Sequence, residues 1–283
     1  PSPLLPPSLP PLVPGEAFVR TPQDIRDEIT KAVDQGRNAS VYIPPDVRLA
    51  FSSNVECSGD MHLSVRSSGE GATLDGKKSS NMFYLSGGCS LYLEALHFVD
   101  GHGDKGGAVR TDGAGDIAMK DVSFTGCEAS QWGGGMYVDG SGDVSLERAS
   151  FSECMAGVDG GGLFVYNSSD VSLDGASFSE CTATAKNGGG MVVESSGDVS
   201  LDGASFSECT ASDNGGGMVV VNSGDVSLDG ASFSDCTAAQ DGGGMFVYNS
   251  GDVSLDGASF SECTATATNG GGMVVANSGD VSL

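Results

Sequence analysis

The sequence predicts an all-β fold, a right-handed parallel β-helix, because three markers recur in phase along the chain. A Cys follows each repeated Phe after three residues, and a run of three Gly follows each Cys. Since these markers keep their spacing over six units, we expect each unit of about 27 residues to form one coil that stacks on the next. The repeated Phe residues are Phe124, Phe151, Phe178, Phe206, Phe233 and Phe260.

Each unit holds three short strands separated by turns. In one unit, Val171 and Leu173 alternate with polar residues, as in a strand with one buried face. An Asp-Gly turn leads to a second strand, Ala-Ser-Phe-Ser, and a polar loop leads to a third, Gly-Met-Val-Val. The preferred crossover of parallel strands makes the coil right-handed. Residues 61–283 leave room for about eight such coils.

The chain divides into three regions. Residues 1–17 form an extended Pro-rich arm. Residues 18–60 form an N-terminal cap, in which Thr21 and Pro22 begin a short amphipathic helix that covers the first coil. Residues 61–283 hold the repeats, and we expect the array to continue beyond them.

Composition argues against several functions. The chain has 38 acidic and 13 basic residues, so its net charge of −25 repels nucleic acids. No segment has the roughly 20 apolar residues that span a membrane. With three His and near-identical units, the sequence offers no asymmetric active site. We therefore assign no catalytic residue and expect a protein that is not an enzyme.

The repeat resembles that of the polymorphic outer membrane proteins, which carry Gly-Gly-Ala-[Ile/Leu/Val] and Phe-x-x-Asn on a right-handed β-helix. Residues 106–109 (Gly-Gly-Ala-Val) match the first motif, and residues 151–154 (Phe-Ser-Glu-Cys) match the second with Cys in place of Asn. Residues 72–76 also resemble the first coils of pectin-lyase-like proteins. The resemblance covers about residues 40–283 and implies a secreted or surface-exposed protein used for adhesion or as a scaffold.

The arm carries a second resemblance. Residues 1–14 are similar to the proline-rich stretches of algal cell-wall and flagellar-surface glycoproteins. In those proteins such prolines become hydroxylated and glycosylated. This resemblance implies an extracellular location, in a cell wall or on a flagellar surface.

The repeated cysteines are expected to form one inward-facing file. Neighbouring members would lie about 4.8 Å apart, which allows either buried free thiols or disulfides. Cys57 and Cys89 lie outside this file and could pair with each other. The structural cysteine ladder comprises Cys127, Cys154, Cys181, Cys209, Cys236 and Cys263.

Two files of carboxylates are expected to face outward. One reading is that solvent and salt screen these like charges. The other is that Ca²⁺, which prefers oxygen ligands, binds between neighbouring carboxylates; no other cofactor is expected. The calcium candidates in the first file are Asp143, Asp170, Asp198, Asp225 and Asp252, and the second file holds Glu147, Asp174, Asp202, Asp229 and Asp256.

The third strand of each unit predicts an apolar surface, which we call the outer stripe. If Met and the constant Val of this strand face inward, the residues between and after them face outward. Stacked apolar residues on a surface are typical of an interaction site, although such residues also favour strands in general and could lie under a loop. The proposed binding residues are Tyr137, Phe164, Tyr166, Val192, Val219, Phe246, Tyr248 and Val274.

One early coil is irregular and carries mixed charges. Paired acids there could perform general acid–base chemistry, although polar loop residues are the simpler reading. This irregular patch consists of His97, His102, Asp104, Lys105, Arg110 and Asp112. Two N-glycosylation sequons, at Asn38 and Asn167, are compatible with secretion.

Together these features predict an extracellular structural or adhesive scaffold without catalytic activity. Its uniform faces would bind other surface or filament proteins, further copies of itself, or glycans. The alternatives are a polysaccharide-degrading lyase or hydrolase of the pectin-lyase-like class, and a calcium-stabilised surface adhesin.

Overall fold

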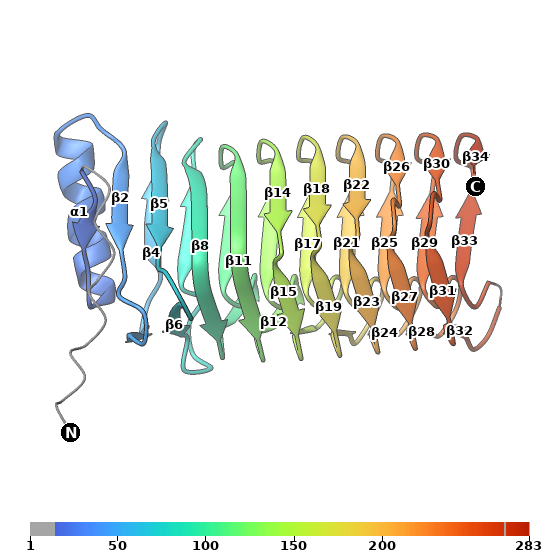
Figure 1. Ribbon diagram of the computed structural model, residues 1–283. Helices are drawn as coiled ribbons and strands as arrows, with labels where there is room; N and C mark the ends of the chain where they lie inside the picture. The colour runs from blue at the N-terminus through green and yellow to red at the C-terminus, as the bar shows by residue number, and fades with distance from the viewer. Residues whose placement is uncertain (1–14, 269, 283) are drawn as a thin grey trace, which may run out of the picture.

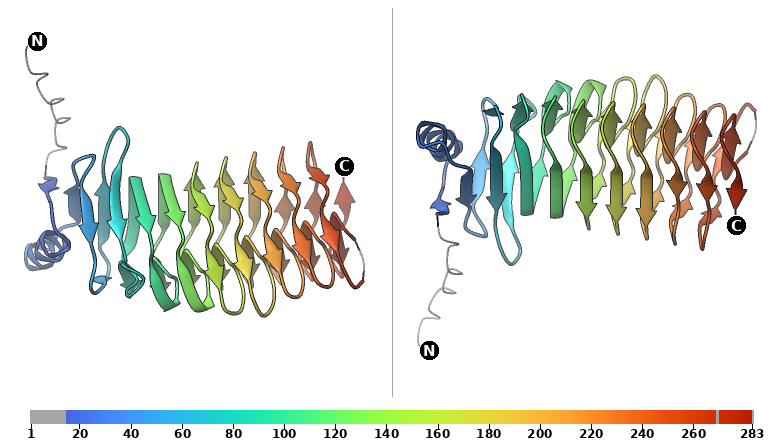
Figure 2. Two further views of the ribbon diagram at one scale, coloured as in Figure 1. Left: turned by 90° about the horizontal axis from the view of Figure 1, so that it is seen from below. Right: turned by 90° about the horizontal axis from the view of Figure 1, so that it is seen from above.

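The computed structural model describes residues 15–268 and 270–282, so most of the predicted Pro-rich arm lies outside the described residues. In the described part, short parallel strands stack coil upon coil into a straight rod (Figure 1). The predicted parallel β-helix is confirmed. The views from below and above show the same regular stack, with the single helix of the described chain at one end (Figure 2).

One side of the rod is a nine-stranded sheet that takes one strand from each coil. Eight of these strands begin within residues 61–283, as the spacing of the repeats predicts. The strands are β4 (Val55–Ser58), β7 (Phe83–Ser86), β10 (Val109–Asp112), β13 (Met136–Asp139), β17 (Leu163–Tyr166), β21 (Met191–Glu194), β25 (Met218–Val221), β29 (Met245–Tyr248) and β33 (Met273–Ala276).

A second, 18-stranded sheet combines the first two strands that we expect in each unit. Its members are β1 (Ala17–Phe18), β2 (Ala39–Tyr42), β3 (Arg48–Ala50), β5 (His62–Arg66), β6 (Ala72–Asp75), β8 (Ser90–Val99), β11 (Ile117–Thr125), β14 (Val144–Glu147), β15 (Ser150–Ser152), β18 (Val171–Asp174), β19 (Ser177–Ser179), β22 (Val199–Asp202), β23 (Ser205–Ser207), β26 (Val226–Ser227), β27 (Ser232–Ser234), β30 (Val253–Ser254), β31 (Ser259–Ser261) and β34 (Val281–Ser282).

The third sheet lies where the sequence indicates only a polar loop. Its later strands are two residues long, too short to show a period of two in the sequence. The seven strands are β9 (His102–Lys105), β12 (Glu128–Trp132), β16 (Met155–Ala156), β20 (Thr182–Ala183), β24 (Thr210–Ala211), β28 (Thr237–Ala238) and β32 (Thr264–Ala265).

Helix α1 (Pro22–Asp34) covers the first coil, as expected (Figure 1). The Thr21 side chain accepts a hydrogen bond from the Asp24 backbone N–H, and the Asp24 carboxylate accepts one from the Thr21 N–H. This capping box, with Pro22 at the first helical turn, explains where the helix begins. Ile25, Ile29 and Ala32 are buried against the strands, so the apolar face of α1 closes the core.

The core consists of vertical files of identical residues. The rings of the predicted Phe file are stacked, with centroids of neighbouring rings 4.6–4.8 Å apart from Phe124 to Phe260. The expected inward Val of the third strand lies in the same core, as at Val193. In-register pairing of the repeats therefore places each apolar residue on its own copy in the next coil.

The glycine triplet permits a tight turn beside the third strand. Gly188 has a φ of +62°, a conformation that favours glycine. A Cβ on Gly189 would lie 2.5 Å from the Thr210 backbone nitrogen in the next coil. The triplet is thus required by backbone conformation at its first residue and by close contact between coils at its second.

Cys57 and Cys89 form a disulfide between Cα atoms 6.0 Å apart, which confirms the pairing that we considered possible. Cys57 lies in β4 and Cys89 immediately before β8. The bond therefore crosslinks the first coils near the cap. Among the described residues, no helix is both long enough and apolar enough to cross a membrane.

Candidate functional site: an aromatic groove on the nine-stranded sheet

The outer stripe points away from the main core, but most of it is not exposed. Tyr137, Phe164, Val192 and Val219 are at most 6% exposed and form a second, smaller apolar cluster. The expectation that these four residues face solvent is therefore wrong. Only Tyr166 and Tyr248 are clearly exposed, at 38% and 40%, while Phe246 and Val274 are partly buried.

The glycine triplets bury the stripe. A Cβ built on Gly188 would contact the Cγ2 methyl of Val192, and one built on Gly215 would contact that of Val219. The turn before each third strand therefore folds back over the outward side chain four residues later. This contact between a turn and its own strand is not visible in a pattern of alternating residues.

An aromatic groove opens where this stripe meets the only Trp of the chain. Trp132, at the end of β12, has its ring centroid 6.2 Å from those of both Tyr137 and Phe164. Tyr166 contributes an exposed ring from the end of β17. The groove has a cavity volume of about 400 Å³ and is also lined by Lys105, Asp139, Asp159, Lys186 and Glu194.

A hydrogen-bonded chain holds the polar groups of the groove. The Lys105 ammonium donates to the Tyr137 hydroxyl at 3.0 Å, and that hydroxyl donates to the Asp139 carboxylate at 3.0 Å. Lys105 Nζ also lies 4.9 Å from the centre of the Trp132 ring. Burial, together with the bond to Asp139, raises the pKa of Tyr137 above its ordinary value. Tyr137 therefore stays protonated and fixes the orientation of both neighbours.

Trp132 and Lys186 line this groove although no motif in the sequence pointed to them. They reach it because the third sheet and its turns lie beside the third strand of each coil. The Asp159 carboxylate, on the same wall, accepts hydrogen bonds from the Asn187 backbone and side chain at 2.9 and 3.1 Å. A single Trp immediately before a glycine triplet is the one signal in the sequence that could have indicated this site.

The first acidic file is placed as expected, facing outward along the rod. Each Asp Oδ1 accepts a hydrogen bond from the backbone N–H of the matching Asp one coil later, for example at 3.0 Å between Asp170 and Asp198. The same bond recurs along the file. The five calcium candidates are Asp143, Asp170, Asp198, Asp225 and Asp252.

No bound calcium is needed to explain the spacing of these carboxylates. One oxygen of each is already directed at a backbone N–H, which partly offsets the repulsion between neighbours. Among the described residues, no group of three or more His, Cys, Asp or Glu side chains is arranged to hold a metal ion. Calcium binding stays a prediction.

The cysteine ladder is placed in the core as one file of free thiols. Each of its first five members is buried, and Cys263 is half-buried. The Cys181 thiol lies 3.5 Å from the Phe151 carbonyl oxygen, and Cys154 and Cys209 have equivalent contacts. Hydrogen bonding to the neighbouring thiol and burial raise the pKa of Cys154, Cys181 and Cys209 well above the ordinary value.

The structure distributes the residues of the irregular patch over all three sheets. His97 lies in β8, whereas Arg110 and Asp112 pair with each other in β10. The β9 strand places Lys105 in the aromatic groove, and Asp104 accepts a hydrogen bond from Ser130. The last member, His102, is also in β9. Acid–base chemistry by paired acids in this patch stays an untested interpretation.

A second groove lies beside the loop at residues 67–71, where the turn is longer than in later coils. It has a cavity volume of about 540 Å³, and Arg66, Glu94, His97 and Asp121 are among its lining residues. The two ring nitrogens of His97 are held by the Ser123 hydroxyl at 2.7 Å and the Glu70 carbonyl at 2.6 Å. His97 therefore anchors the loop to the sheet.

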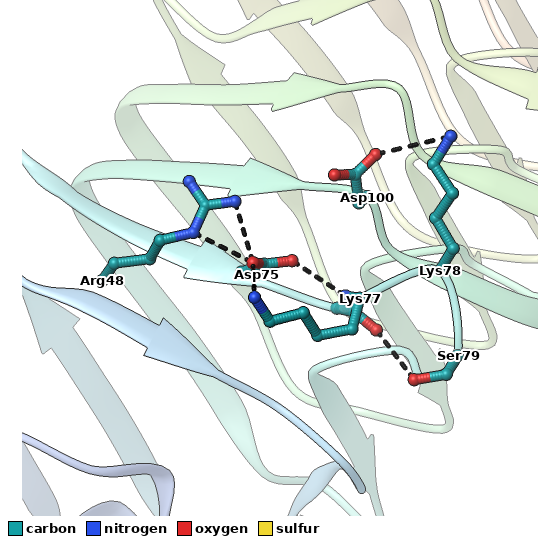
Figure 3. Close-up of polar contacts among 7 residues, drawn as sticks. Arg48, Asp75, Lys77, Lys78, Ser79 and Asp100 are labelled. Atoms are coloured by element: carbon teal, nitrogen blue, oxygen red, sulfur yellow. Dashed lines mark hydrogen bonds and ion pairs between the residues drawn. The ribbon is translucent and has the colours of Figure 1, made fainter.

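A cluster of charged residues around Asp75 stabilises a turn near the cap. The Asp75 carboxylate is buried and contacts the Arg48 guanidinium at 2.8 Å and the Lys77 ammonium at 2.7 Å (Figure 3). It also accepts the Lys77 backbone N–H at 2.8 Å. Lys78 pairs with Asp100 in the next coil at 3.8 Å. These contacts hold the turn at residues 76–79 and leave Asp75 no free oxygen for chemistry.

Both sequons are accessible. Asn38 and Asn167 are exposed, and Asn167 has a φ of +50° in the turn that follows Tyr166. The Asn38 Oδ1 atom accepts a hydrogen bond from the His62 backbone N–H at 3.0 Å. Glycosylation at either residue stays a prediction.

A family model described as the right handed beta helix region matches residues 64–230 and, overlapping them, residues 107–283. The chain belongs to this family. This family match agrees with the stacked parallel coils that the structure shows. No curated protein matches the chain.

The comparison with solved structures found weak matches to polysaccharide lyases. A mannuronic acid specific polysaccharide family 6 lyase from human gut microbiota is 10% identical, covers 87% of this chain and 82% of its own, and has a TM-score of 0.27. Two structures of the family 6 alginate lyase AlyGC are 10% identical, with TM-scores of 0.25 and 0.20. Each of these two matches covers 88% of this chain and 53% of the AlyGC chain. This chain therefore spans about half the length of AlyGC.

These neighbours correct one expectation. We expected a protein that is not an enzyme, yet the three solved structures named above are polysaccharide lyases. The exclusion of an enzyme is contradicted and is withdrawn. At 10% identity and a TM-score of 0.27, the likeness assigns neither an activity nor a catalytic residue to this chain.

Proposed function

We propose that this β-helix is an extracellular or cell-surface protein that binds glycans through the aromatic groove and serves as a structural or adhesive rod. The observation that carries the proposal is the groove itself. The indole of Trp132 and the exposed ring of Tyr166 line it together with lysine and carboxylate side chains. Aromatic rings bind the apolar faces of sugars, and the polar groups bind sugar hydroxyls.

Three further features support a surface location. The Cys57–Cys89 disulfide is typical of proteins that mature in oxidising compartments. Two sequons lie at exposed Asn38 and Asn167. The repeat also resembles that of the polymorphic outer membrane proteins. Lateral contacts with other surface or filament proteins, or with further copies of this chain, would fit the long regular faces of the rod.

Binding to a panel of immobilised oligosaccharides and polysaccharides tests this proposal. We expect the wild-type protein to be retained and the Trp132→Ala, Tyr166→Ser double variant to be lost. Phe18→Ser is the matched control, because Phe18 is an aromatic residue with the same 38% exposure as Tyr166 but lies on the cap. Retention of the double variant, or retention of neither protein, would contradict the proposal.

A second candidate is a polysaccharide-degrading enzyme acting at the groove beside residues 67–71. Glu94 lines this groove, and next to it in the sheet Lys120 lies opposite Glu94 on one side and Glu147 on the other, 3.3 Å from the latter. Burial and then Glu94 raise the pKa of nearby Tyr92 to about 12. Mixed groups of this kind can perform acid–base chemistry.

Release of reducing ends from neutral and acidic polysaccharides tests this second candidate. We expect any such activity to fall by at least about 100-fold in Glu94→Gln or Lys120→Met, since general acid–base groups contribute about that much. Trp132→Ala would weaken substrate binding without such a loss of turnover if both sites operate. Absence of product from every polysaccharide would leave only the binding function.

A further inference from the structure

A second aromatic platform lies on the same sheet as the groove, three coils further along. The Phe246 and Tyr248 rings in β29 are nearly parallel, with centroids 6.3 Å apart. Tyr248 is 40% exposed and Phe246 is partly buried. Among the exposed large hydrophobic residues of the described chain, only Tyr166 and Tyr248 lie in the nine-stranded sheet, and exposed aromatic rings of this kind mark a contact surface.

Strand register aligns this platform with the groove. Tyr166 pairs with Glu194, Glu194 with Val221, and Val221 with Tyr248, so the four side chains form one file along the rod axis. Three strand spacings separate the two Tyr residues by roughly 14 Å. A ligand that contacts both rings must therefore be elongated and lie parallel to the axis.

The charges along this file favour an uncharged ligand. No basic residue follows Lys186 in the sequence, whereas Glu194 lies between the two platforms. The groove itself holds two Lys side chains and three carboxylates. With a net charge of −25 on the whole chain, an acidic polymer would be repelled along this path. Carboxylate oxygens instead accept hydrogen bonds from hydroxyl groups.

We propose that a neutral polysaccharide chain lies along the rod axis and stacks on both platforms, Trp132 with Tyr166 at one end and Tyr248 with Phe246 at the other. This inference rests on the proposed glycan-binding function and adds the class of glycan, its direction and a second contact site. The two platforms act on one chain, so the second contact raises affinity only for a ligand long enough to reach it.

Fluorescence of Trp132, the only Trp of the chain, reports binding at the groove. The probes are disaccharides and hexasaccharides of glucose, mannose and xylose, with oligogalacturonate as the acidic probe. We expect a neutral hexasaccharide to bind about tenfold more tightly than its disaccharide, and oligogalacturonate to bind more weakly than either. Tyr248→Ser should remove the tenfold advantage and leave the disaccharide unchanged.

Two controls separate stacking from folding. Tyr248→Phe keeps the ring and should retain the advantage of the hexasaccharide, and Phe18→Ser on the cap should change neither affinity. If Tyr248→Ser has no effect, if length has no effect, or if the acidic probe binds most tightly, the inference is overturned while glycan binding at Trp132 stands. If no sugar alters Trp132 fluorescence and none binds by calorimetry, both this inference and the proposed glycan-binding function are overturned.

Discussion

At the scale of single residues, Asp75 shows how burial and ion pairing act against each other. Burial alone would raise the pKa of its carboxyl group, but hydrogen bonds from Lys77 and Arg48 outweigh burial and lower it. The folded protein therefore holds the ionised form more strongly than the unfolded chain does. This contribution to stability is present above the ordinary Asp pKa of about 4 and is lost as pH falls through the lowered value.

Asp75→Asn should destabilise the protein by about 1–2 kcal/mol at pH 7, because the charge-assisted hydrogen bonds from Arg48 and Lys77, whose side chains are half-exposed, are lost. Near pH 3 the difference from wild type should shrink, since the wild-type carboxylate is then losing its charge. Urea unfolding at both pH values measures this. A destabilisation that is independent of pH would show that Asp75 acts through packing and not through its charge.

The cysteine ladder makes a chemical prediction at the same scale. Cys154, Cys181 and Cys209 are buried and have raised pKa values, so few of them are thiolates at neutral pH. In the folded protein we expect the five buried thiols not to react with a thiol reagent, and all six thiols to react after unfolding in denaturant. Cys263, which is half-buried, should react first. Rapid labelling of the whole ladder would contradict the stacked arrangement.

At the scale of secondary-structure elements, turns determine how the coils fit together. The Asp-Gly turn and the glycine triplet both use left-handed backbone, as at Gly203 and Gly188. Only the triplet also lies against the next coil, where its second residue leaves no room for a side chain. Each unit therefore contains two kinds of glycine. One kind is required by its left-handed backbone conformation, and the other by the lack of space for a side chain between neighbouring coils.

Gly189→Ala and Gly203→Ala separate these two requirements. A Cβ on Gly203 contacts nothing within 4 Å, so its cost is the left-handed backbone alone, about 1 kcal/mol. A Cβ on Gly189 would meet the Thr210 and Gly216 backbones, which cannot move without separating the coils, so we expect about 3 kcal/mol. Urea unfolding of both variants checks this; equal costs would contradict the close contact between coils.

At the scale of the whole molecule, in-register stacking repeats every surface charge along the rod. Stacked carboxylates repel one another, and a net charge of −25 opposes the folded state. The backbone N–H donated to each Asp of the first file offsets part of this repulsion. In the second file, Glu147 pairs with Lys120 at 3.3 Å, but the later members Asp202, Asp229 and Asp256 follow Lys186, the last basic residue of the sequence.

Salt should therefore stabilise the rod. Raising the ionic strength from about 0.01 M to about 0.15 M shortens the screening length from about 30 Å to about 8 Å, and the melting temperature should rise. Calcium and magnesium at equal ionic strength should have equal effects if screening is sufficient. A larger rise with calcium, reversed by EDTA, would instead show that calcium binds between carboxylates such as Asp170 and Asp198.

Much of this architecture could be predicted from the repeat. The Phe spacing predicted the stacked rings, the alternation at Val171 and Leu173 predicted a strand with one buried face, and Thr21 with Pro22 predicted the helix. Each of these follows from a local period or a local hydrogen bond. Period and register together define which residues share a file, so the Asp file was also correctly placed.

The candidate site could be predicted only in part. The outward direction of Tyr166 and Tyr248 follows from alternation, but the burial of Phe164 does not, because it depends on a turn folding back over its own strand. Trp132 joins the groove because its strand, which the sequence indicates only as a loop, pairs into a third sheet.

By itself, the sequence determined the coil, its register, the inward and outward files and the excess of negative charge. These depend on a period that every unit repeats, so neighbouring residues are sufficient to specify them. Only the tertiary structure decided which outward residues are accessible and which side chains meet in the groove. Both depend on how turns from different sides of the coil approach one strand, and no spacing along the chain specifies that approach.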